Sequence, residues 1–164
     1  MDKDLIIGGA SNYTWTQLKY WVNSIKATGF KGDIVVVATN ITKDTIDKLT
    51  AEGVKVSAYG NQKEDGSFEL KNSLAPHVER FFWIWNHLRD NKDYHYVVVT
   101  DTRDVIFQKD PTSFLEEHCK HFPLIASSEG MQYKDEPWGL SNITECFGPF
   151  FKELIKDKMI YNVG

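Results

Sequence analysis

The stretch YHYVVVTDTRDVIF, residues 94–107, decides the fold more than any other part of the chain. A run of apolar residues ends at two carboxylates, Asp101 and Asp104, which flank Arg103, and apolar residues then resume. This pattern is typical of a buried parallel strand that carries charged side chains at its carboxyl end. Ligands of open α/β sheets bind at that edge. Two acids there predict a site for a hard divalent cation, which in turn binds a diphosphate.

Strand and helix signals alternate along the rest of the chain and predict a three-layer α/β architecture with a mainly parallel sheet. Strands are expected at residues 5–7, 33–38, 54–57, 96–100, 105–107, 124–126 and 159–163. Helices are expected at 14–29, from 42 or 44 to 53, at 73–89 with Ser73 as its cap, at 111–120 and at 150–156. The polar segment 61–71 is interpreted as a loop. The helix at 73–89 is expected to bury a stripe made of Leu74, Val78, Phe81, Trp85 and Leu88.

Length and composition favour one domain over residues 1–164. The chain is 41% hydrophobic and 13% aromatic, which is enough apolar material for one hydrophobic core. Its length of 164 residues is short for two domains. A net charge of −4 and the lack of a Lys/Arg stripe argue against nucleic acid as a partner. No segment approaches the roughly 20 apolar residues of a membrane span, and with no leader-like segment we expect a cytoplasmic protein.

Two further polar segments are expected at the same edge of the sheet as the acids. The segment GGASNY, residues 8–13, has small residues that allow close backbone approach and Tyr13, which can stack on a base. It is neither G-x-G-x-x-G nor a P-loop, so an ordinary turn is the alternative. The segment SSEGMQYKDEPWG, residues 127–139, concentrates acids and aromatics after an expected strand, as a sugar pocket does. Its alternative is a solvated surface loop.

The motif DTRD, residues 101–104, also has a structural alternative, in which Arg103 pairs with a neighbouring carboxylate and nothing is bound. Two acids directly after a buried run repel each other and are partly desolvated unless a positive charge neutralises them. A metal ion or an arginine supplies that charge.

Together these segments resemble the GT-A type glycosyltransferases, which bind a nucleotide-diphosphate sugar on a Rossmann-like half-sheet. The resemblance covers most of the chain, but GT-A enzymes generally carry Asp-x-Asp, and this sequence has Asp-x-x-Asp. It implies Mn²⁺ or Mg²⁺ at Asp101 and Asp104, with the direct ligand of the two left open. It also implies that Glu129 and Asp135 orient the sugar or activate the acceptor. The nucleotide-sugar contacts that it implies are Gly9, Ala10, Ser11, Tyr13, Thr39, Arg80, Asp101, Thr102 and Arg103.

The activity implied by the resemblance is metal-dependent transfer of a sugar from a UDP- or GDP-sugar to a hydroxyl of a glycan or other acceptor. Retention or inversion at the anomeric carbon stays open. GT-A domains usually continue past the last expected strand, so a C-terminally truncated chain, a naturally minimal member and a donor-binding remnant are all open. The non-enzyme alternative is a sugar-nucleotide-binding or assembly module. A haloacid-dehalogenase type phosphatase is less favoured, because its aspartates follow the first strand.

Overall fold

The computed structural model describes residues 3–71, 76–119 and 121–162. The chain divides into two compact units, Met1–His121 and Phe122–Gly164, and each is described by itself. The single domain expected over residues 1–164 stays a prediction, because compact units can be parts of one domain.

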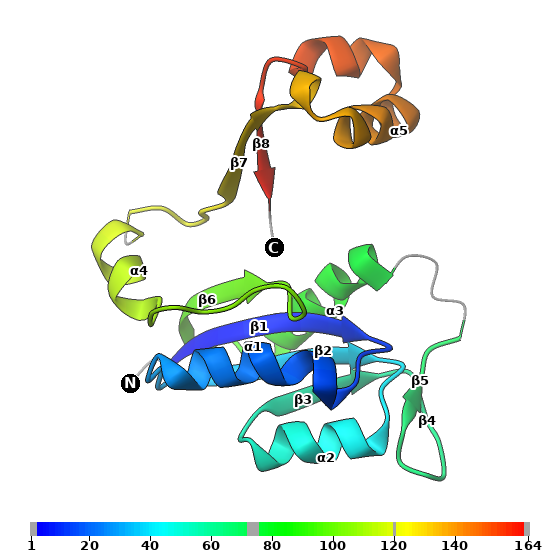
Figure 1. Ribbon diagram of the computed structural model, residues 1–164, viewed down its shortest axis with the longest axis vertical. Helices are drawn as coiled ribbons and strands as arrows, with labels where there is room; N and C mark the ends of the chain where they lie inside the picture. Colours follow the sequence, from blue (N-terminus) through cyan, green and yellow to red (C-terminus); the bar gives the residue numbers. More distant parts are fainter. Residues whose placement is uncertain (1–2, 72–75, 120, 163–164) are drawn as a thin grey trace. The chain divides into compact units, whose positions relative to one another are not determined.

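The first unit alternates strands and helices, as the sequence predicts. Its elements are β1 (Lys3–Ser11), α1 (Trp15–Ala27), β2 (Asp33–Thr39), α2 (Lys43–Ala51), β3 (Lys55–Tyr59), β4 (Asn61–Gln62), β5 (Phe68–Glu69), α3 (Pro76–Asp90), β6 (Tyr94–Thr100) and α4 (Thr112–His118). Four of the strands form a parallel sheet of order β3-β2-β1-β6 (Figure 1). Strands β4 and β5 pair as a short antiparallel hairpin within the segment that was predicted as a loop.

Helices cover both faces of this sheet. Trp21 of α1 and Leu49 of α2 share one buried cluster with Val36 of β2. Ile84 of α3 shares a second buried cluster with Ile7 of β1. Since neighbouring residues of a strand point to opposite faces, these clusters lie on the two sides of the sheet. The layered, mainly parallel α/β arrangement is therefore confirmed for this unit.

Two predicted strands of the acidic stretch differ in the structure. Among the described strands β6 pairs only with β1. It is therefore an edge strand and not a fully buried one, and its residue Val97 is exposed. Residues 105–107 are not a strand. The backbone N–H of Phe107 instead donates to Oγ of Ser24 at 3.0 Å, and Val105 packs beside the cluster that α1 covers. After the acids the chain therefore leaves the strand pairing and packs beside α1.

The buried face of α3 agrees only in part with the predicted one, because Leu88 packs beside the buried cluster of Ile84 while other members of the predicted stripe do not. Val78 and Trp85 are more than half exposed, whereas Ile84 is buried. The predicted cap Ser73 and the predicted core residue Leu74 lie outside the described residues. The face of the helix that contacts the sheet is thus centred on Ile84 and includes Leu88, but it does not include Val78 or Trp85.

The second unit contains β7 (Ser127–Gln132), the 3-10 helix η1 (Tyr133–Asp135), α5 (Pro137–Ile155) and β8 (Met159–Asn162). Strand β7 pairs with β8 in antiparallel fashion. The strand predicted at 124–126 is wrong, because the strand begins at Ser127 and contains part of the segment that was predicted as a loop. The predicted helix at 150–156 is the second half of α5, which is kinked at Gly148, where φ is 81°.

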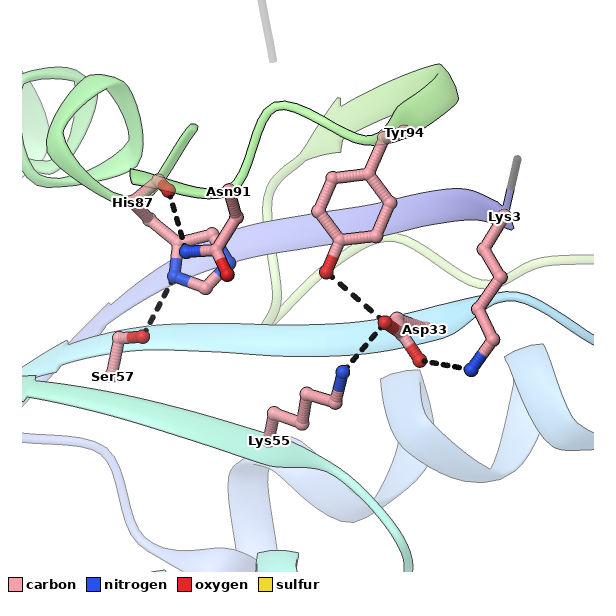
Figure 2. A network of polar contacts seen from close by, with 7 residues as sticks. All are labelled: Lys3, Asp33, Lys55, Ser57, His87, Asn91 and Tyr94. Carbon is pink, nitrogen blue, oxygen red and sulfur yellow. Dashed lines mark hydrogen bonds and ion pairs between the residues drawn. The ribbon is translucent and has the colours of Figure 1, made fainter. Parts of the chain in front are cut away.

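An ionic cluster joins the amino ends of the four parallel strands (Figure 2). Asp33 accepts a hydrogen bond from Lys55 Nζ at 2.6 Å and from the Tyr94 hydroxyl at 3.1 Å, and Lys3 Nζ lies 3.6 Å away. Burial acts to raise the pKa of Asp33, but these hydrogen bonds and the two lysine charges outweigh burial and lower it. Burial and the bond to Asp33 raise the pKa of Tyr94 to about 12.

We expect Asp33→Asn to lower the free energy of unfolding by about 1–3 kcal/mol at neutral pH, since it removes charge-assisted hydrogen bonds. Because the pKa of Asp33 is lower in the folded state, its stabilisation is present above the unfolded pKa and is lost as the pH falls through the folded value. The gap between wild type and variant, measured by urea denaturation, should therefore shrink below about pH 4. Asp47→Asn is the control, because Asp47 pairs with Lys43 on the exposed surface of α2. An equal effect of both variants would contradict the prediction.

Candidate functional site

The carboxyl ends of β1, β2 and β6 meet at one edge of the parallel sheet. The register pairs Ser11 with Thr39 and Gly8 with Thr100. From β1 the sheet runs through β2 to β3 in one direction and to β6 in the other, so the strand order reverses between β1 and β6. Ligand crevices of open α/β sheets lie outside the carboxyl ends of the strands at such a reversal.

Two hollows at this edge share part of their lining, and their volumes are about 230 Å³ and 240 Å³. The first is lined by Gly9, Ala10, Ser11, Tyr13, Val37, Thr39, His77, Glu79, Arg80 and Trp83. The second is lined by Gly9, Tyr13, His77, Arg80, Asp101, Thr102, Arg103 and Asp104. Every residue predicted to contact the nucleotide therefore lines one hollow or both, and both predicted metal ligands line the second.

Gly8 and Gly9 lie within β1, not in a turn after it as the sequence predicts. A side-chain carbon on Gly8 would lie 2.3 Å from Cγ2 of Thr102, and one on Gly9 would lie 2.7 Å from Cβ of Arg80. Both distances are too short for any side chain. Glycine at these two positions therefore allows the loop after β6 and the helix α3 to approach β1.

The hydroxyl of Thr102 fixes the acidic loop to β1. Thr102 is buried, and its Oγ1 donates a hydrogen bond of 2.9 Å to the carbonyl oxygen of Gly9. Asp101 precedes this anchor in the sequence, and Asp104 follows two residues later. The backbone around both acids is thus tied to the end of β1, while their carboxylates line the hollow.

Two arginines supply positive charge to the second hollow. Nη1 of Arg80 pairs with Oδ1 of Asp101. The guanidinium carbon of Arg103 lies 6.0 Å from the centroid of the Tyr13 ring, at the limit of a cation–π contact. An arginine therefore neutralises one of the two acids, as the structural alternative in the sequence analysis requires. The arginine is Arg80 of α3, not Arg103, and the acid is Asp101.

The carboxylates of Asp101 and Asp104 fit a hard divalent cation. Mg²⁺ usually binds one or two protein carboxylates and completes its coordination with water and substrate phosphates. Asp101 is partly exposed and Asp104 is exposed, so both reach a ligand in the hollow. Within the described part of the chain no three His, Cys, Asp or Glu residues form a metal-binding group. Phosphate oxygens and water would supply the remaining ligands here.

The structure adds residues of α3 that the sequence analysis did not select. His77, Glu79 and Trp83 line the first hollow, together with Val37 of β2. The Trp83 ring stacks on Tyr59 with centroids 4.4 Å apart, which holds it at the sheet. The spacing of residues 77, 80 and 83 along one helical face is the sequence signal for this lining, and the stronger apolar pattern of the same helix obscures it.

The predicted catalytic residues Glu129 and Asp135 lie in the second unit, Glu129 on β7 and Asp135 in η1, and both are exposed. The parallel strand expected to deliver them to the edge with Asp101 is wrong, because the only described partner of β7 is the antiparallel strand β8. Their catalytic role stays a prediction that the topology no longer supports.

No family model, curated protein or solved structure matches this chain. Among the described helices, none combines the length and the apolar character that crossing a membrane requires. The two hollows and their residues are therefore the observations from which a function is inferred.

We expect Thr102→Val, which removes the hydroxyl and keeps the shape, to lower the free energy of unfolding by about 1–3 kcal/mol. It should also weaken Mn²⁺ binding measured by calorimetry, because the two acids lose their anchor. Thr45→Val is the matched control: Thr45 is buried in α2, and its Oγ1 lies 2.9 Å from Oγ1 of Thr42. The control should lose stability and keep its Mn²⁺ affinity. Equal Mn²⁺ affinities in both variants would show that Thr102 does not position the acids.

Proposed function

We propose that the chain is a metal-dependent glycosyltransferase that takes a sugar from a UDP- or GDP-sugar and transfers it to an acceptor hydroxyl. One observation carries the proposal: the second hollow, which contains Asp101 and Asp104, shares Gly9, Tyr13 and Arg80 with the first hollow. Their place at the reversal of strand order favours a nucleotide ligand. The resemblance of the sequence to GT-A enzymes supports the same assignment.

The two hollows suit the two ends of a nucleoside diphosphate. In the first, Tyr13 and Trp83 offer aromatic faces to a base, and the side chain of Thr39 offers a hydroxyl. In the second, Arg80 and Arg103 offer guanidinium groups, whose planar fork matches phosphate oxygens. The base therefore belongs with the first hollow and the diphosphate with the second.

In the proposed reaction, each residue near the diphosphate has a separate task. A divalent cation at Asp101 and Asp104, when bound, neutralises charge on the departing nucleoside diphosphate. Arg80 and Arg103 orient the phosphates, and Gly9 leaves the space in which the Arg80 stem lies against β1. The resemblance to GT-A enzymes alone implies a task for Glu129 or Asp135, which is to orient the sugar or accept the proton of the attacking hydroxyl.

UDP or GDP should bind much more weakly in a chelator than in Mn²⁺. We expect the affinity to fall at least about tenfold, or about 1.4 kcal/mol. The reason is that the two acids of the second hollow offset the charges of its two arginines and leave little net positive charge for a diphosphate. Calorimetry on the wild type, Asp101→Asn and Asp104→Asn measures this. Either asparagine variant should lose the metal effect and keep its far-UV circular dichroism. Equal wild-type affinity in chelator and in Mn²⁺ would contradict the metal-dependent proposal.

Turnover separates the enzyme from a nucleotide-sugar-binding module. If the chain is an enzyme, UDP- or GDP-sugar should be consumed with Mn²⁺ present, and Glu129→Ala or Asp135→Ala should slow consumption while UDP and GDP affinities stay unchanged. Glu145→Ala, on the exposed surface of α5, is the control and should change neither. Tight donor binding without hydrolysis or transfer to any supplied sugar acceptor would favour the binding module instead.

A further inference from the structure

Arg80 stands between the two hollows with its charge engaged by a proposed metal ligand. It lines both hollows, and its Nη1 pairs with Oδ1 of Asp101. Asp101 is also one of the two carboxylates that fit a divalent cation. The same carboxylate therefore has two alternative positive partners, one of which belongs to the chain itself.

The Arg80–Asp101 pair is more sheltered than a surface ion pair. The two side chains are 22% and 35% exposed, whereas those of the Lys43–Asp47 pair on α2 are 57% and 59% exposed. Water and salt screen partly buried charges less than exposed ones. A cation that arrives at Asp101 must therefore displace a partner that is well held.

The stem of Arg80 is confined, whereas its guanidinium can change partners. A side-chain carbon on Gly9 would lie 2.7, 3.1 and 3.4 Å from Cβ, Cδ and Cγ of Arg80, so the stem lies directly against the β1 backbone. Because the residue lines both hollows, rotation at the end of the side chain is enough to move the charge from Asp101 to a ligand.

We propose that Arg80 is a built-in competitor for the divalent cation, which holds Asp101 until a diphosphate arrives and then binds the diphosphate. This inference rests on the proposed function and adds an order to it. A cation that binds alone breaks the Arg80–Asp101 ion pair and leaves the Arg80 guanidinium without a phosphate to bind. A cation that arrives with a diphosphate releases a guanidinium that binds phosphate oxygens at once. Cation and nucleotide therefore bind with positive coupling.

The first test titrates Mn²⁺ into the chain without nucleotide, with the free Mn²⁺ signal in electron paramagnetic resonance as the readout. We expect Arg80→Gln to raise Mn²⁺ affinity at least about fivefold. Arg103→Gln is the matched control, since it removes the same charge from the same hollow and Arg103 is exposed. We expect that control to change Mn²⁺ affinity by less than about threefold.

Two further variants separate competition at Asp101 from a general charge effect. In an Asp101→Asn background, Arg80→Gln should no longer change Mn²⁺ affinity, because the contested carboxylate is gone. Arg80→Lys should fall between wild type and Arg80→Gln, since lysine keeps the charge and loses the planar fork. If circular dichroism shows that Arg80→Gln does not fold, the lysine variant gives the comparison.

The second test measures how much Mn²⁺ raises the affinity for UDP or GDP. This factor should be smaller in Arg80→Gln than in wild type and nearly unchanged in Thr45→Val. Unchanged or lower Mn²⁺ affinity in Arg80→Gln, or an equal gain in Arg103→Gln, would overturn the competition. If neither UDP nor GDP binds at all, the proposed function fails, whereas the Mn²⁺ titration still decides whether Arg80 competes at Asp101.

Discussion

The absence of side chains at two consecutive positions of β1 is the constraint on which the site depends. Gly8 leaves the space that Thr102 fills on one face of the sheet, and Gly9 leaves the space for Arg80 on the other. Without the first approach, the acidic loop could not place the Thr102 hydroxyl on the β1 backbone. Without the second, α3 could not bring a guanidinium to Asp101. One strand end therefore organises both the negative and the positive charges of the site.

The two ends of the parallel sheet use charge differently. At the amino ends, Asp33 is surrounded by Lys3, Lys55 and Tyr94, and its charge is used to join strands. At the carboxyl ends, Asp101 and Asp104 line a hollow, and only one described ion pair involves them. Satisfied charges stabilise a fold, whereas charges that face a hollow are available to a ligand.

The sequence predicted most of the sheet and the residues at its edge, because strong periodicity and a sharp change from apolar to acidic residues are local signals. It placed Asp101 and Asp104 after a strand, and the structure brings them together with Gly9 and Tyr13. It left Thr42 and Asp44 as alternative starts of the second helix, and the structure has Thr42 as the cap, whose Oγ1 accepts from the backbone N–H of Thr45 at 3.3 Å.

The errors have a common physical cause, which is tertiary contact that a local pattern does not contain. Residues 105–107 have strand propensity, but a hydrogen bond to Ser24 and packing beside α1 hold them outside the strand pairing. At α3, the close approach at Gly9 brings Arg80 against β1, and Val78 and Trp85 of the predicted stripe stay exposed. The antiparallel pairing of β7 with β8 depends on a partner about 30 residues away.

Paramagnetic broadening by Mn²⁺ in the presence of UDP or GDP tests the central claim most directly, because it locates the cation without any assumption about turnover. Amide signals of an isotopically labelled chain would be compared in Mn²⁺ and in diamagnetic Mg²⁺. The account predicts the strongest broadening at Gly9, Thr102 and Arg103, and sharp signals for Asp33 and Tyr94 at the opposite end of the strands. Strongest broadening around Asp33, or broadening at Gly9 no greater than at Asp33, would contradict it.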